Sequence, residues 1–249
     1  MLKGLFKLSW IEMKIFVREP MGVIGSLLLP VLLFVFVGRA LRFSPRGGAG
    51  IPVSRLPFNI AILTALLISL GAVQSLVGIM AIYREGGILK RLRATPLSPV
   101  TILGSHVMVK LGFTLVALVL MILAGRRVLP DAMPASGVSF VAAVLLGTTS
   151  ILSFGFVMAS LVRSARFAQV LGATLTYVML ALSGVFFPVD RLPRWLQFVA
   201  NSLPTTHAVT LMRAIWAGEP WMTQLATVGA LAVIFAACIG FSARWFRWE

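Results

Sequence analysis

Long uninterrupted apolar runs constrain this chain more than any other feature of its sequence. The runs at 58–82 and 100–124 exceed the roughly 18 to 20 apolar residues with which an α-helix crosses the hydrocarbon layer of a bilayer. Because 59% of the 249 residues are hydrophobic and only 12% are charged, a soluble domain of this size has too little interior to bury them. Strands of a membrane barrel would instead alternate over about ten residues. The sequence therefore predicts an all-α integral membrane protein.

Six apolar segments predict six transmembrane helices in a single domain, residues 1–249. Their approximate bounds are 21–40, 58–82, 100–124, 137–162, 167–187 and 222–241. An even number of spans places both ends of the chain on one side of the membrane. With the ends inside, 13 of the 22 Lys and Arg are cytoplasmic, including all the lysines, in agreement with the positive-inside rule. We therefore expect a multi-pass protein of the inner, cytoplasmic membrane with both termini in the cytoplasm.

The net charge of +15 does not require a nucleic acid partner. The cations lie mainly between and beside the predicted spans, where anionic lipid head groups attract them. The single cysteine, Cys238, excludes an intrachain disulfide. No small-residue cleavage motif follows the first apolar run, so we expect no cleaved signal peptide.

Residues 1–19 predict a helix at the cytoplasmic surface of the membrane. On a helix, four cations of this segment share one narrow stripe, and most apolar residues lie on other faces. The pattern is imperfect, because Trp10 lies near the cationic stripe and two glutamates lie opposite it. The alternative is an ordinary extension of the first span. The charged residues assigned to this interfacial helix are Lys3, Lys7, Glu12, Lys14, Arg18 and Glu19.

The segment 188–218, between the fifth and sixth predicted spans, is too long and too apolar to be a simple loop. Prolines prevent any part of it from crossing the membrane as one helix. The spacing of its apolar residues predicts two short helices, the second at 205–216 and ended by Gly218. We expect both to lie along or dip into the outer leaflet as paired re-entrant helices.

The chain lacks the residue patterns of an enzyme or of an ion-coupled carrier. None of the seven acidic residues lies within a predicted span, whereas an ion-coupled carrier usually keeps a carboxylate there. The two histidines, His106 and His207, belong to opposite faces of the membrane, so we expect no metal site. Ser153 lacks a nucleophile elbow, and no Gly-rich loop ends in Lys-Ser or Lys-Thr. We therefore assign no catalytic residue to this chain.

One short charged segment, YREGGILKRLRATPLSP at residues 83–99, separates the second and third predicted spans. Its pair of glycines ends the preceding helix, and its Thr-Pro step ends the segment. Between them, an Ile and two Leu form one apolar edge of a short helix, while the cations project elsewhere. Spacing alone leaves three roles open: docking into a partner protein, contact with anionic lipid, or a solvated loop.

Three stretches of the sequence resemble the type-2 ABC exporter permeases, a family that includes antibiotic, lipo-oligosaccharide and polysaccharide exporters. The segment 83–99 resembles the signature loop of that family. The family's second signature, in which the fifth span runs into external helices, is similar to LSGVFFPVDRLPRWLQFVANSLPTTHAVTLMR. The E-x-K-x-x-x-R-E-P pattern at 12–20 matches its N-terminal helix. The resemblance covers essentially the whole chain, in order.

The resemblance implies a permease dimer, made of two identical copies or of this chain and a paralogue, that carries two ABC ATPase subunits. ATP and Mg²⁺ would be bound by those subunits, and this chain would hold no cofactor or metal. It also implies that residues 84–95 form the coupling helix that docks into each ATPase. The residues that it assigns to coupling are Arg84, Glu85, Gly86, Gly87, Leu89, Lys90, Arg91, Leu92, Arg93, Thr95 and Pro96.

By the same resemblance, the second and fifth spans of both copies would line the cargo path. Candidate lining residues, each of which could equally pack between helices, are Gln74, Ser75, Thr174, Tyr177 and Met179. Polysaccharide exporters of this family tend to carry aromatic belts, whereas all six tryptophans here lie near the ends of spans. This departure favours an apolar or amphipathic cargo, such as a drug, a lipid or a lipid-linked glycan, over a long glycan.

Two other classes of membrane protein remain open at this point. The chain would suit an ion-coupled carrier or channel that works without an ATPase, or an immunity or sensor protein that binds a ligand without moving it. A neighbouring gene for a soluble ATPase would favour the exporter, and a flux driven by an ion gradient without ATP would favour the carrier.

Overall fold

The computed structural model describes residues 2–18, 24–42, 59–87, 99–128, 134, 136–161 and 164–245. Every regular element within these residues is a helix, as the apolar runs predict. In chain order they are α1 (Leu2–Arg18), the π-helix η1 (Ile24–Leu28), α3 (Leu29–Arg42), α4 (Ile60–Glu85), α6 (Pro99–Val128), α7 (Gly137–Leu161), α8 (Ala165–Leu182), the 3-10 helix η4 (Val189–Arg191), α9 (Arg194–Ser202), α10 (Pro204–Trp216), the 3-10 helix η5 (Trp221–Gln224) and α11 (Leu225–Trp245).

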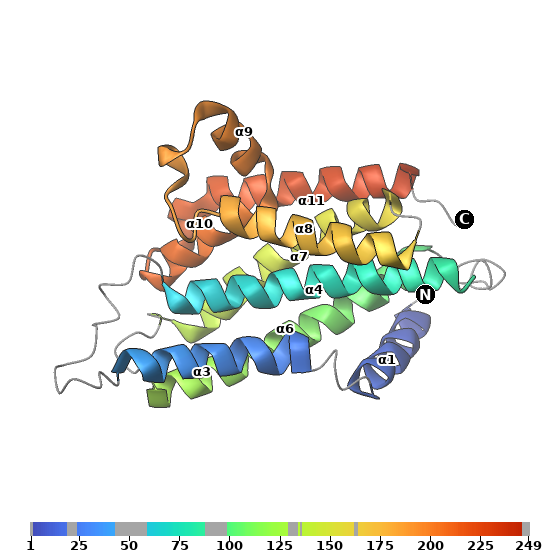
Figure 1. The fold of residues 1–249 in the computed structure, drawn as a ribbon, viewed down its shortest axis with the longest axis horizontal. Coiled ribbons are helices and arrows are strands. Elements are labelled where there is room, and N and C mark those ends of the chain that lie inside the picture. The colour runs from blue at the N-terminus through green and yellow to red at the C-terminus, as the bar shows by residue number, and fades with distance from the viewer. Residues whose placement is uncertain are drawn as a thin grey trace.

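The long helices lie side by side and alternate in direction (Figure 1). Helix α1 crosses the end of the bundle at which α4 ends and α6 begins, and the last turns of α11 lie at this same end. Helices α9 and α10 lie toward the opposite end. The fold therefore places the end of α4 and the start of α6 away from the short helices that follow α8. The segment 88–98 lies outside the described residues.

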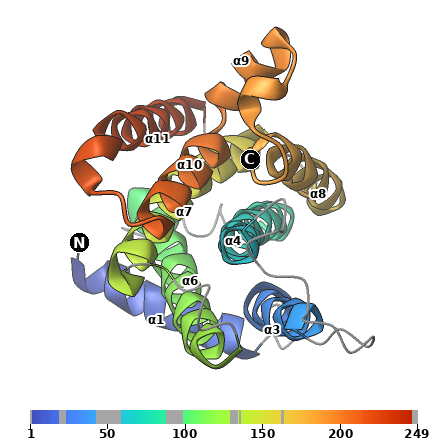
Figure 2. The same ribbon diagram turned by 90° about the vertical axis from the view of Figure 1, so that its left-hand side faces the viewer.

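Helices α4 and α7 form the centre of the bundle. Viewed along the bundle, α4 is surrounded by α3, α6, α7 and α8 (Figure 2), and it contacts all of them. Helix α7 contacts α4, α6, α10 and α11. Both helices are apolar on every face, as expected of helices that have neighbours on several sides, and Leu66, Leu70 and Ile151 are fully buried. Helix α11 lies on the outside, where Val233 is 68% exposed and suited to lipid.

Four described helices are long and apolar enough to cross a membrane. They comprise Ala61–Tyr83, Gly104–Arg127, Gly137–Ser160 and Trp221–Ser242. The predicted first and fifth spans correspond to shorter apolar helices, Leu29–Ala40 and Arg166–Leu182. The chain is thus a helical protein with several apolar helices of membrane-spanning type, and the count of six spans stays a prediction.

The predicted first span contains a change of helix type. The turn Ile24–Leu28 is a π-helix, and the α-helical part of this span begins only at Leu29. Pro30 explains the change, because proline has no backbone N–H and its ring clashes with the carbonyl group four residues earlier. Within α3, Pro30 occupies the first turn, where proline is tolerated.

Polar side chains cap three of the long helices at their N-termini. The Asn59 side chain accepts hydrogen bonds from two N–H groups in the first turn of α4, at 2.9 and 3.3 Å. Ser136 and Ser164 each accept one at 3.3 Å, at the starts of α7 and α8. These caps satisfy N–H groups that have no partner within the helix, and they fix where each helix begins.

Helix α7 approaches its neighbours closely because it carries glycine at the contacts. A Cβ atom at Gly147 would lie 2.8 Å from Cβ of Ala208 in α10, and one at Gly155 would lie 3.0 Å from Cγ1 of Val73 in α4. The Ser69 and Thr148 hydroxyls, 2.7 Å apart, join α4 to α7. Small residues and interhelical hydrogen bonds are the usual means of holding helices together in lipid.

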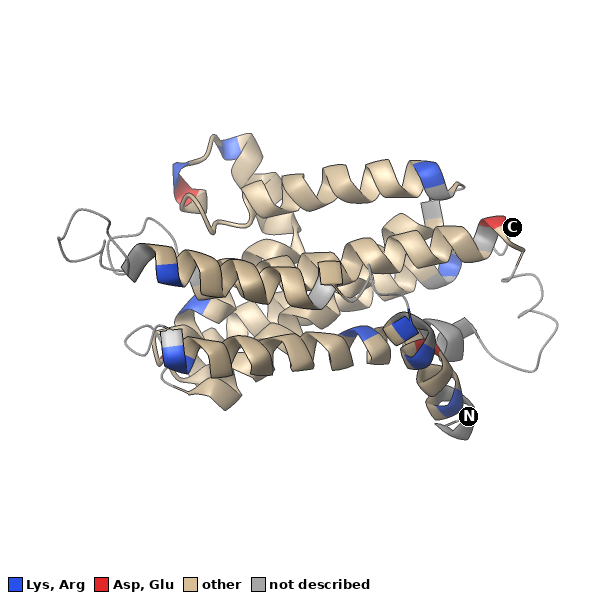
Figure 3. Cartoon of the chain, turned by 60° about the horizontal axis from the view of Figure 1, so that its bottom comes forward, with Lys and Arg blue, Asp and Glu red and all other residues tan. Residues whose placement is uncertain are grey.

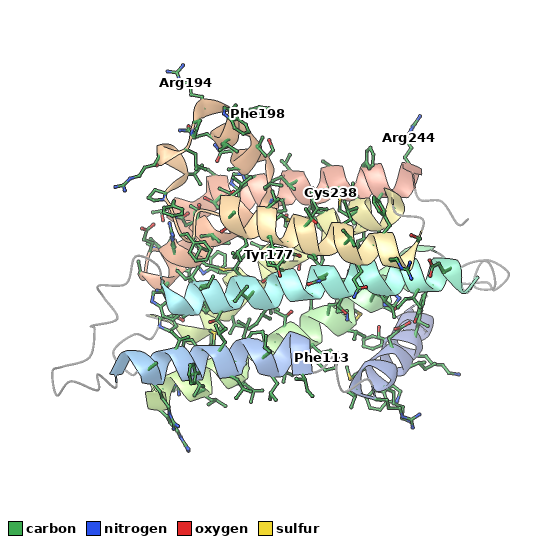
Figure 4. The ribbon with its side chains drawn as sticks, viewed as in Figure 1. Phe113, Tyr177, Arg194, Phe198, Cys238 and Arg244 are labelled. Atoms are coloured by element: carbon green, nitrogen blue, oxygen red, sulfur yellow. The ribbon has the colours of Figure 1, made fainter. Side chains whose placement is uncertain are left out.

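Two short helices occupy the segment after α8, which confirms that part of the prediction. Helix α10 spans Pro204–Trp216, and Gly218, with φ of +88°, follows its end. Helix α10 is largely buried against α7, whereas α9 projects from the bundle and exposes Trp195 and Phe198 (Figure 4). Their position in the membrane stays a prediction.

Substitution of Gly147 by Ala tests the close approach of α7 and α10. The new methyl group would overlap with Ala208, so we expect a loss of about 1–3 kcal/mol in the free energy of unfolding and a lower thermal midpoint in detergent. The control is Gly229→Ala in α11, where a Cβ meets no atom within 4 Å. This control should be neutral or stabilising by about 0.4–1 kcal/mol. Equal effects of the two substitutions would contradict the packing argument.

Candidate functional site

The strongest candidate site is a buried polar cluster where α1 meets the end of α4 and the start of α6. Charged side chains otherwise gather at the two ends of the bundle, and the helices between them are almost entirely uncharged (Figure 3). Glu12 from α1, Tyr83 from α4, and His106 and Lys110 from α6 make up the cluster. Glu12, His106 and Lys110 are nine-tenths or more buried. Ionisable groups in such surroundings are costly, so their presence indicates a role.

The Glu12 carboxylate contacts both long helices. The Tyr83 hydroxyl donates a hydrogen bond to Oε1 of Glu12 at 2.8 Å, and Nδ1 of His106 lies 3.5 Å from Oε2. The Tyr83 and His106 rings also meet edge to face, with centroids 5.5 Å apart. One carboxylate of α1 thus joins the last turns of α4 to the early turns of α6.

Lys110 supplies the positive charge of the cluster. Its Nζ donates a hydrogen bond to Oγ of Ser75 at 2.6 Å, which links α6 to α4 a second time. Burial raises the pKa of Glu12, while the hydrogen bond from Tyr83 and the charge of Lys110 act in the opposite direction. Ser9 adds a weak contact between α1 and α6, because its Oγ lies 4.0 Å from Sδ of Met108.

This chemistry fits mechanical connection better than catalysis. Among the described residues, no group of three or more His, Cys, Asp or Glu could hold a metal ion. Nε2 of His106 is buried and has no hydrogen-bond partner among the residues that the structure describes. His207 lies in α10 toward the opposite end of the bundle, where its Nε2 is 2.9 Å from the Asn201 carbonyl. The two histidines are therefore far apart, as the sequence predicts.

The predicted coupling residues fall at the edge of the described structure. Arg84 and Glu85 form the end of α4, and Gly86 and Gly87 form a turn in which Gly87 has φ of +64°. A left-handed residue at this point ends the helix, which agrees with the predicted role of the glycine pair. The remaining predicted coupling residues lie outside the described residues: Leu89, Lys90, Arg91, Leu92, Arg93, Thr95 and Pro96.

The predicted interfacial residues divide between two faces of α1. Lys7, Lys14 and Arg18 are exposed, and Glu12 is buried against the bundle. The exposed face also carries Phe6, Trp10, Met13 and Val17, so apolar and cationic side chains lie together on the outside. Lys3 belongs to α1, although its side chain is not among those described, and Glu19 lies outside the described residues.

The candidate path residues differ in exposure. Tyr177 is 71% exposed and projects from α8 beside α4 (Figure 4). Gln74 in α4 and Thr174 in α8 are also exposed, and the Thr174 hydroxyl donates to the Val170 carbonyl at 2.9 Å. Ser75 is partly buried and accepts the hydrogen bond of Lys110, whereas Met179 is 2% exposed and packs in the core. Thr174 and Tyr177 therefore share one exposed face of α8, and Gln74 is exposed on α4 near Gly172 of α8.

Sequence reasoning missed the joining role of Arg213 in α10. Its Nη2 donates hydrogen bonds to the backbone carbonyls of Gly184 and Val185, at 2.5 and 3.0 Å. Gly184 has φ of +82°, so Arg213 fixes the turn that follows α8 against α10. The sequence signal that could have indicated this role is a single cation within the otherwise apolar run TLMRAIW.

The long apolar helices, with a polar cluster at one end, define a helical protein of membrane-spanning type. The model of the ABC-2 type transporter family matches residues 4–216, and the chain belongs to that family. It is 36% identical over 81 residues to nodulation protein J of Rhizobium leguminosarum bv. trifolii, a match to 32% of this chain and 31% of that protein. It is 34% identical over 77 residues to the capsule polysaccharide export inner-membrane protein CtrC of Neisseria meningitidis, 28% of this chain and 29% of CtrC.

A double-mutant cycle on Lys110 and Glu12 tests the electrostatic link within the cluster. Lys110→Met removes the charge that favours ionised Glu12, so we expect it to lower the free energy of unfolding by about 2 kcal/mol. The double variant with Glu12→Gln should lose less than the sum of the two single variants, because no buried charge is then left without its partner. Thermal unfolding in detergent measures the free energy of unfolding of the wild type, the two single variants and the double variant. Additive losses would refute the link.

Proposed function

We propose that this chain is the permease subunit of an ATP-driven ABC exporter and that a separate ABC ATPase supplies the energy. Membership of the ABC-2 type transporter family supports the proposal most directly. The absence of a phosphate-binding loop from the sequence agrees with it, because ATP and Mg²⁺ would then be bound by two ATPase subunits and not by this chain. A second permease, identical or paralogous, completes the complex.

The membrane arrangement follows from this proposal. Six spans are obtained if α3 and α8 cross the membrane together with the four longer apolar helices. With the permease in the inner membrane, both termini and the segment 84–95 then lie in the cytoplasm. Helices α9 and α10 form re-entrant helices on the outside. The exposed Trp195 of α9 suits head-group depth, and the exposed apolar and cationic face of α1 suits anionic lipid.

The coupling segment at 84–95 would dock into the ATPase. The flanking helices support this role, because α4 ends and α6 begins at the end of the bundle where α1 lies (Figure 1). ATP-driven closure of the ATPases would press on this segment and shift the spans between two states, one open inward and one open outward. Glu12, Tyr83 and His106 of the cluster lie at this end, and Lys110 follows His106 by one turn of α6. None of the acidic residues lies within a predicted span, which favours coupling over an ion path through the chain.

The cargo that fits best combines an apolar part with a polar part. The exposed face of α8 carries Thr174 and Tyr177 among aliphatic side chains such as Val170 and Val178, and Gln74 is exposed on the neighbouring α4. CtrC, by its name, exports a capsule polysaccharide. We therefore propose an amphipathic cargo, for which a lipid-linked glycan is the leading class and a drug or a lipid the next.

Charge reversal in the coupling segment tests the docking. The triple variant Lys90→Glu, Arg91→Glu and Arg93→Glu should insert normally and yet lose ATP-dependent export, because repulsion replaces attraction at the contact with the ATPase. Proteoliposomes that contain the permease and its ATPase measure cargo efflux and ATP hydrolysis together. The control is Arg126→Glu with Arg127→Glu, two exposed cations at the far end of α6, and it should keep export. Unchanged coupling in the triple variant would refute the docking role.

Cysteine labelling tests the proposed path. In a Cys238→Ala background, a water-soluble thiol reagent should modify cysteines placed at Gln74, Thr174 and Tyr177, and cargo should slow the reaction. Val233→Cys is the matched control, because this residue of α11 is 68% exposed on the outside of the bundle and should face lipid. Equal, cargo-independent labelling at all four positions would exclude the α4 and α8 face as the path.

A further inference from the structure

One carboxylate connects three helices at the end of the bundle where α4 ends and α6 begins. Tyr83 lies in the last turn of α4, and His106 lies early in α6, so these residues belong to the two stems between which the segment is held. Both contact Glu12, at 2.8 and 3.5 Å. Glu12 itself belongs to α1, a helix far from both stems in the sequence.

The other contacts of α1 show why its connection through Glu12 matters for its position. Among the described elements, α1 packs chiefly on α6, and its outer face leaves Phe6, Trp10 and Val17 about 60% exposed. Apolar contact with lipid holds a helix at the surface but does not fix its position along the surface, because lipid offers the same environment everywhere. A buried hydrogen bond is directional, and it is costly to break without a replacement. Glu12 therefore sets the register of α1 against the two stems.

We infer that Glu12 is a positioning residue that ties α1 to both stems of the coupling segment, so that all three move as one body. This inference rests on the proposed function, in which an ATPase displaces the coupling segment. Lys110 of α6 extends the tie, because its Nζ donates a hydrogen bond of 2.6 Å to Oγ of Ser75. Ser75 lies about two turns before Tyr83 in α4, deeper in the bundle. Movement at the surface would thus reach α4 and α6 together, and neither helix could shift alone.

Two substitutions and their combination test the tie in the reconstituted complex of permease and ATPase. Glu12→Ala removes both contacts, and it should lower the cargo moved per ATP hydrolysed about tenfold or more, the factor expected when a buried hydrogen bond to a charged group is lost. Tyr83→Phe removes one hydroxyl and should produce a smaller loss. The double variant should be no worse than Glu12→Ala alone, since both substitutions break one link.

The matched control is Glu219→Ala, which removes an exposed carboxylate that accepts a hydrogen bond from Nε2 of Gln224 at 2.8 Å. Glu219 follows α10 and lies outside the cluster, so its loss should leave the ratio of cargo to ATP unchanged. A loss of coupling with Glu219→Ala equal to that with Glu12→Ala would overturn the inference.

A cross-link distinguishes a tie from a general defect in folding. Cysteines in place of Ser9 and Met108, whose side chains are 4.0 Å apart, allow a short reducible reagent to join α1 to α6 in a Cys238→Ala background. In the Glu12→Ala variant, this cross-link should restore the cargo moved per ATP, and reduction should abolish it again. Failure of the cross-link to restore coupling would show that Glu12 does not act by holding α1.

The outcomes also separate this inference from the proposed function. If the wild-type complex moves no cargo with ATP, the proposed function fails. If the wild-type complex couples ATP to export and both Glu12→Ala and Tyr83→Phe couple equally well, only the inference about Glu12 fails. Tyr83→Phe decides the matter if Glu12→Ala does not insert, because it alters a single hydroxyl group.

Discussion

The close contact between α4 and α7 is the interaction on which the rest of the structure depends. Apolar side chains gain little by leaving lipid, so helices in a membrane stay together through tight packing and hydrogen bonds. Gly155 lets α7 approach Val73 of α4, and Ser69 pairs with Thr148 at 2.7 Å between the same helices. Helices α3, α6 and α8 pack on α4, and α10 and α11 pack on α7. The contact therefore holds two groups of helices together.

Polar connections lie at both ends of this frame and differ in kind. At one end, Glu12 joins α1 to α4 and α6 through side chains that are buried and ionisable. At the other end, Arg213 holds the turn after α8 through backbone carbonyls alone. A side-chain link can be broken and remade as the groups around it move, whereas a link to backbone carbonyls fixes a turn. Under the proposed function, this difference suits an end that moves with the ATPases and a more rigid opposite end.

The apolar runs were sufficient to predict helices, and several boundaries followed from single residues. Gly87 and Gly218 both have positive φ where the sequence indicated helix ends, because glycine adopts that conformation without steric cost. The change at Ile24–Leu28 was not predicted, because periodicity does not reveal that Pro30 converts a preceding turn to a π-helix. Glu12 was assigned to a surface helix by its charge, and its burial could not be predicted. That burial depends on Tyr83 and His106, which are distant in sequence and become neighbours only through tertiary packing.

The alternating direction of the helices has a practical meaning for the assembled complex. Helix α1 and the last turns of α11 lie at one end of the bundle, next to the stems of the coupling segment (Figure 1). Under the proposed function, anything joined to either terminus would share a compartment with the ATPases and would compete with them for room. Helices α9 and α10 lie toward the opposite end. Under the same proposal, an extracellular or periplasmic component that approached from that end would receive cargo away from the machinery that drives its release.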